Sequence, residues 1–84
     1  MAFDRLVEEE LATARRTYPQ IHSLHEGYAV ILEEVKELEA EVFKKPFNRD
    51  PEHILKELIQ IAAMCRRTAE DCHLLIDVSE LAES

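Results

Sequence analysis

Glycine, cysteine and tryptophan are scarce in this chain. Its 84 residues include one glycine, two cysteines and no tryptophan. Because Gly27 is the sole glycine, no glycine-rich loop can cradle a phosphate, which excludes a P-loop or Rossmann nucleotide site. Two cysteines are too few for a disulfide framework. No apolar run approaches the roughly 18 residues of a membrane-spanning helix, so we expect no transmembrane segment and no signal-peptide core.

Basic residues are also in the minority. Ten lysines and arginines stand against 18 aspartates and glutamates, which gives a formal net charge of -8. Nucleic acids and anionic membranes both attract basic surfaces, so we expect neither as a partner. Three prolines among many glutamates, leucines and alanines favour helices with few turns. We therefore predict a single all-α domain over residues 1–84 that is soluble and cytoplasmic.

Hydrophobic spacing divides this domain into three helices, over residues 1–18, 20–45 and 51–78. Apolar side chains recur at intervals of three and four residues in each segment. Pro19 and Pro46 end the first two segments. The third begins at Asp50-Pro51-Glu52, where an N-cap acid precedes a first-turn proline. The start of the second helix stays open, because Pro19 fits a first turn and Ser23 with Glu26 fits a capping box.

The two longer helices each span about 25 residues, or roughly 38 Å. Joined by a short loop, they are expected to form an antiparallel hairpin that the shorter N-terminal helix covers only in part. A core this small supplies no more than ~3–5 kcal/mol without a staple or partner. We therefore expect a four-helix-bundle core in a homo-oligomer. In that bundle Tyr28 is interpreted as a core residue, and Cys65 and Cys72 as buried free thiols.

Carboxylates at helical spacing form the one candidate chemical site. Glu34 and Glu37 project together from the second helix, and Glu57 and Gln60 project together from the third. The antiparallel hairpin can bring the two pairs face to face, and Mg²⁺ prefers such oxygen ligands. The alternative is a solvated helix surface, since residues 33–41 contain five glutamates in nine positions and make this spacing common by chance.

A family resemblance bears on that choice. Glu33-Glu34-Val35-Lys36-Glu37 reads E-E-x-x-E, and Glu57-Leu58-Ile59-Gln60 follows at a suitable interval. Together with HEGYAVILEEVKEL and KELIQIAAMCRR, these motifs resemble the MazG-like branch of the all-α nucleoside triphosphate pyrophosphatases. The likeness runs roughly from His22 to Asp71. It implies Mg²⁺-dependent hydrolysis, with Mn²⁺ as an alternative ion, of a nucleoside triphosphate to monophosphate and pyrophosphate, by a homodimer or homotetramer.

The resemblance also implies roles for single residues. Glu34, Glu37 and Glu57 would be metal ligands, and Glu33 a ligand or the base that orients the attacking water. Gln60 stands where the family carries aspartate, and its amide offers Mg²⁺ an oxygen without a charge.

Three basic side chains are candidates for substrate binding, namely His53, Lys44 and Arg67. Each also has an ordinary interpretation, as a first-turn surface histidine, a helix-dipole partner or a solubilising charge. The rival function for the whole chain is a non-catalytic helical dimer that acts as a nucleotide-binding or regulatory module.

Overall fold

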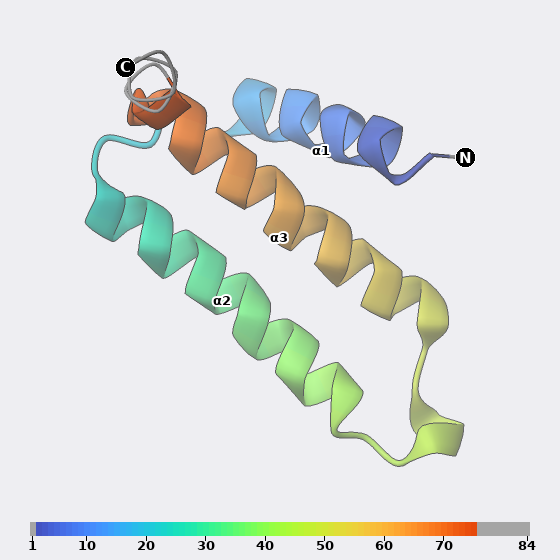
Figure 1. The fold of residues 1–84 in the computed structure, drawn as a ribbon. Helices are drawn as coiled ribbons and strands as arrows, with labels where there is room; N and C mark the ends of the chain where they lie inside the picture. The colour runs from blue at the N-terminus through green and yellow to red at the C-terminus, as the bar shows by residue number, and fades with distance from the viewer. Residues whose placement is uncertain (1, 76–84) are drawn as a thin grey trace, which may run out of the picture.

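The structure, a computed structural model, describes residues 2–75 and contains three α-helices with no β-strand in that range (Figure 1). These are α1 (Phe3–Thr17), α2 (Leu24–Val42) and α3 (Pro51–Asp71), with a short 3₁₀ turn, η1 (Pro46–Asn48), between α2 and α3. Helices α2 and α3 form an antiparallel hairpin, and α1 packs on α3 alone. The predicted all-α class is confirmed. None of the helices described is long and apolar enough to cross a membrane.

Side-chain caps fix where α2 and α3 begin. The Ser23 hydroxyl accepts a hydrogen bond from the Glu26 backbone N–H at 3.1 Å, and α2 starts at Leu24. The Glu26 carboxylate in turn accepts from the His22 N–H. Of the two possible starts, the structure therefore has the one capped by Ser23, and the helix begins at Leu24, four residues after the expected position 20. In α3 the Asp50 carboxylate caps the Glu52 and His53 N–H groups, with Pro51 in the first turn.

Both long helices end earlier than expected. Helix α2 stops at Val42 rather than at residue 45, because the chain enters a turn before Pro46. Helix α3 stops at Asp71, and His73 adopts a left-handed backbone with φ of 59° that cannot continue an α-helix. The predicted continuation over 76–78 and the expected fraying of 79–84 lie outside the described residues.

The core lies between α1 and α3. Its buried side chains are Val7, Leu11, Ala14, Ala63 and Met64. Among the described residues no large side chain is fully enclosed, and many apolar side chains remain exposed. Tyr28 is 64% exposed, so its assignment to the core is wrong for the single chain. Cys65 is likewise exposed rather than buried, and Cys72 is half-buried.

Buried ion pairs and hydrogen bonds hold the segment that joins α1 to α2 against the end of α3. Arg15 donates to Asp71 at 2.9 Å, and the other Asp71 oxygen accepts the Ile21 N–H at 3.0 Å. Arg67 donates to the Pro19 carbonyl and lies beside Asp71. Burial alone would raise the pKa of Asp71, but the hydrogen bonds from Arg15 and Ile21 outweigh it, so the pKa lies below its ordinary value.

At the single glycine, Gly27, α2 lies close against α3. A Cβ placed on Gly27 would lie 2.5 Å from Cγ2 and 2.7 Å from Oγ1 of Thr68. Thr68 is buried and its hydroxyl donates to the Met64 carbonyl at 2.8 Å, so the threonine has little freedom to move away. Glycine is therefore needed here for space, since its backbone is ordinary α-helix with negative φ.

Candidate cation site

Three carboxylates meet in the hairpin. Glu34 and Glu37 project from α2 and Glu57 projects from α3, and one oxygen of each lies within 4.8 Å of the others. The i, i+3 spacing puts the first two on one face of α2. The antiparallel pairing with α3 then supplies the third. The expected convergence of these three residues is therefore present, with Glu57 buried, Glu34 half-buried and Glu37 exposed.

Two oxygens of this cluster have no hydrogen-bond donor within residues 2–75. Oε2 of Glu34 and Oε2 of Glu57 are both inaccessible to water and unpartnered. Glu57 as a whole is only 4% exposed. A buried carboxylate oxygen without a donor is costly, and a second carboxylate nearby adds repulsion. A shared proton or a bound cation removes both penalties, and a divalent cation removes more charge.

The burial of the cluster and the closeness of its carboxylates change the pKa of Glu34. Burial, assisted by a hydrogen bond to Glu57 and by the charges of Glu37 and Glu57, raises the pKa of Glu34 to about 7. Such a hydrogen bond exists only when one of the two carboxyl groups carries a proton, because two ionised carboxylates can only accept. At neutral pH this proton and a metal ion would therefore compete for the same oxygens.

The other carboxylate oxygen of Glu57, Oε1, contacts His53. His53 Nε2 lies 3.0 Å from Glu57 Oε1, and His53 Nδ1 lies 3.8 Å from Oε2 of the buried Glu41. Glu41 also accepts from the Lys44 ammonium at 2.8 Å and from the Asp50 N–H at 3.0 Å. The Lys44 and Asp50 hydrogen bonds keep the pKa of Glu41 below its ordinary value. His53 and Lys44, both expected as substrate-binding residues, are thus engaged with carboxylates of the chain.

A cavity of about 430 Å³ adjoins the cluster on the side of α1. Glu34 belongs to both the cluster and the cavity wall. Glu33, Gln60 and Arg67 also line the cavity. Arg67 is 4% exposed and its Nε has no hydrogen-bond partner. The cavity wall thus includes Glu33, the expected base, and Gln60, the expected amide ligand. It also includes Arg67, one of the basic residues expected to bind substrate.

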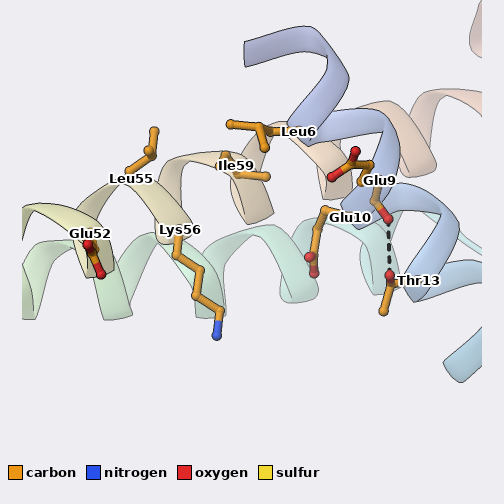
Figure 2. A pocket seen from close by; sticks show the side chains of 8 residues that line it. All are labelled: Leu6, Glu9, Glu10, Thr13, Glu52, Leu55, Lys56 and Ile59. Carbon is orange, nitrogen blue, oxygen red and sulfur yellow. Dashed lines mark hydrogen bonds between the residues drawn. The ribbon is translucent and has the colours of Figure 1, made fainter. Parts of the chain in front are cut away.

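A second hollow, of about 410 Å³, lies between α1 and the first half of α3 (Figure 2). Its apolar part is formed by Leu6, Leu55 and Ile59, and Glu9, Glu10, Glu52 and Lys56 surround them. None of the three clustered carboxylates lines this hollow. We therefore assign the candidate chemistry to the cavity beside Glu34.

Comparison with protein-family models, with curated proteins and with solved structures finds no match to this chain.

Sequence reasoning missed the part that Glu41 plays. It is one of five glutamates in the run 33–41, and the residue type alone does not distinguish it from the exposed Glu39. The available signal was its position seven residues after Glu34, two helical turns along the same face.

Proposed function

We propose that the chain binds a divalent cation, Mg²⁺ or Mn²⁺, through Glu34, Glu37 and Glu57, and hydrolyses a nucleoside triphosphate to monophosphate and pyrophosphate. The observation that carries the cation site is the pair of buried, donor-free oxygens on Glu34 and Glu57. The adjoining cavity and the MazG-like motifs at the same residues support the choice of reaction.

In this proposal Mg²⁺ neutralises charge on the phosphates. Glu33, on the cavity wall, accepts a proton from the attacking water. Water adds across the anhydride between the α and β phosphates, that P–O bond breaks, and pyrophosphate leaves. Of the described residues that line the cavity, Arg67 is the one with a cationic side chain. Its Nε–H, which has no partner among them, would bind an oxygen of the substrate. Gln60 contributes an amide oxygen to the same space.

Gln60 favours a second candidate, in which the same cavity binds a nucleotide without cleaving it. A neutral amide in place of an acid leaves the site one negative charge short of the family pattern. Binding and hydrolysis therefore need separate measurements.

Titration calorimetry with Mn²⁺ and with Mg²⁺ tests the cation site, and Glu39→Gln is the matched control for Glu34→Gln. Glu39 lies on the same helix but is exposed and outside the cluster. We expect Glu34→Gln to weaken cation binding by at least about tenfold and Glu39→Gln to leave it unchanged. No binding by the wild-type chain at millimolar cation would contradict the proposal.

Release of pyrophosphate from a panel of standard, deoxy and damaged nucleoside triphosphates then separates the two candidates. Release that depends on Mg²⁺ and is lost in Glu34→Gln supports the hydrolase. Tight binding of a non-hydrolysable triphosphate without any release by the wild type supports the binding module.

We also propose that a second copy of the chain covers one exposed face of the hairpin. On α2 the spacing of apolar residues alternates strictly between four and three, as in a coiled-coil seam. These residues are Leu24, Tyr28, Ile31, Val35, Leu38 and Val42, here called the α2 seam. Four of the six are more than a third exposed. On α3 the exposed Leu58 and Cys65 lie, by helical spacing, away from Ala63, which packs on α1.

The size of this face suits a dimer. Two helix faces about 30 Å long and roughly 10 Å wide present on the order of 600 Å² per chain, against ~800 Å² per partner in a standard interface. A second copy of the chain presents the same apolar seam. The rest of the surface of this acidic chain is charged, so it repels the same surface on another copy. The proposed assembly is therefore a homodimer with a four-helix core.

A further inference from the structure

We infer that His53 is a positioning residue for Glu57, and that Glu41 acts through His53 by holding its ring in place. This inference rests on the proposed cation site. It extends that site to two residues that do not belong to the three-carboxylate cluster, and it gives His53 a role other than contact with a substrate.

The geometry assigns the direction of the hydrogen bond. The 3.0 Å contact joins His53 Nε2 to Oε1 of Glu57. A carboxylate that binds a cation is ionised and its oxygens can only accept, so in that state Nε2 carries the hydrogen. That bond uses Oε1, whereas Oε2 is buried without a hydrogen-bond donor among the described residues and is available to a cation. The histidine thus selects which oxygen of Glu57 is free for a cation.

Glu41 lies on the other side of the ring. Its carboxylate is 3% exposed, and its Oε2 is 3.8 Å from His53 Nδ1, an electrostatic contact rather than a short hydrogen bond. The carboxylate cannot swing away, because the Asp50 N–H binds one of its oxygens and Lys44 the other. A fixed negative charge beside Nδ1 favours the ring orientation that points Nε2 at Glu57.

This arrangement restricts the conformations of the Glu57 side chain before a cation binds. Glu57 is one helical turn after His53, so the two side chains meet without further backbone change. A carboxylate already held in one rotamer loses less conformational freedom on binding. Hydrogen-bonded partners behind metal ligands typically contribute about 10–100-fold to metal affinity, and the half-exposed imidazole places our expectation at the lower end.

The experiment measures the dissociation constant for Mn²⁺ by calorimetry, together with the melting temperature of each metal-free protein. His53→Ala removes the donor, and His53→Gln keeps an N–H near the position of Nε2. His25→Ala is the matched control, because His25 is an exposed histidine in the first turn of α2. We expect about tenfold weaker Mn²⁺ binding for His53→Ala, recovery in His53→Gln, and no change for His25→Ala.

Glu41→Gln tests the second link. If Glu41 acts through His53, Glu41→Gln weakens Mn²⁺ binding in the wild-type background and has no further effect in the His53→Ala background. Equal effects in the two backgrounds would overturn this link.

The remaining outcomes are distinct. If the wild type and His53→Ala bind Mn²⁺ equally well, the positioning role is wrong and the cation site stands. If His53→Gln fails to recover affinity while its melting temperature matches the wild type, the hydrogen-bond mechanism is wrong. If the wild type binds no Mn²⁺, both the cation site and the role of His53 are overturned.

Discussion

Glu34 and Glu57 keep acidic oxygens out of water without providing donors for them. Most buried polar groups in proteins have a partner, because an unsatisfied one costs about 1–3 kcal/mol. A surface of solvated glutamates would not incur this cost, so the interpretation of residues 33–41 as a purely solvated face does not fit Glu34 or Glu41. It does fit Glu33, Glu37 and Glu39, which are exposed.

The raised pKa of Glu34 predicts how stability depends on pH. The pKa of about 7 in the folded chain lies above the ordinary 4.5. The contribution of Glu34 to stability is therefore fully present below about pH 4.5 and is lost as the pH rises through 7. We expect the melting temperature of the metal-free wild type to fall relative to that of Glu34→Gln between pH 5 and pH 8.

Thermal unfolding of both proteins across this range measures the effect. A difference of several degrees is expected, since about 1 kcal/mol shifts the melting temperature of a domain this size by ~4–8 °C. Saturating Mg²⁺ should stabilise the wild type more at pH 8 than at pH 6, because it replaces the proton. Parallel pH profiles for the two proteins would contradict the raised pKa.

At the residue scale, the sequence predicts the three clustered carboxylates better than the residues that surround them. The i, i+3 rule predicts that Glu34 and Glu37 share one face of α2, and the antiparallel hairpin allows Glu57 to meet them. The link from Glu41 to His53 and on to Glu57 depends on how far α2 and α3 are rotated and shifted relative to each other. Side-chain packing sets that rotation, and no local pattern encodes it.

At the scale of helices, the contact between Gly27 and Thr68 sets how closely α2 and α3 approach. Gly27→Ala would gain up to about 1 kcal/mol in helix propensity. The added Cβ would meet a pinned, buried threonine, and overpacking of this kind costs ~1–3 kcal/mol. We expect Gly27→Ala to destabilise the chain by about 1–2 kcal/mol in chemical denaturation.

Thr68→Ala tests the cause of that loss. It removes Cγ2 and Oγ1, the two atoms that a Cβ at residue 27 would meet most closely. Gly27→Ala should therefore be less harmful, or even stabilising, in the Thr68→Ala background. Strictly additive free energies of unfolding in the four proteins would show that the close approach does not matter.

Helix positions followed from the sequence more readily than helix ends. Proline and the apolar period locate α1, α2 and α3. The end of α3 depends instead on the left-handed turn at His73, a conformation that histidine enters less readily than glycine. The ion pairs from Arg15 to Asp71 and Glu70 hold the last turn before it. Those partners are 55 and 56 residues apart in sequence, so local spacing could not reveal them.

At the scale of the molecule, the exposed α2 seam predicts self-association. Val35 lies in the middle of the seam and is 38% exposed in the single chain. In a dimer, Val35→Glu would bury an unpaired charge, which is strongly unfavourable. We expect sedimentation to give twice the 9.8 kDa mass of one chain for the wild type and a shift toward monomer for Val35→Glu.

Ala40→Glu is the control for that substitution. It adds the same charge at an exposed position on the opposite side of α2 from the seam. It should leave the mass unchanged. A wild type that sediments as a monomer at micromolar concentration, or a Val35→Glu variant that stays dimeric, would refute the proposed interface.

Helix α1 packs on α3 and not on α2. The cavity beside Glu34 lies in the space that this arrangement leaves between α1 and α2. Its width therefore depends on where α1 rests along α3, through contacts such as Val7, Leu11 and Ala63. The spacing of the carboxylates depends instead on how α2 meets α3. Under the proposed function, the size of the ligand that fits the cavity and the affinity for the ion are therefore separable, and substitutions beneath α1 are expected to alter the first without disturbing the second.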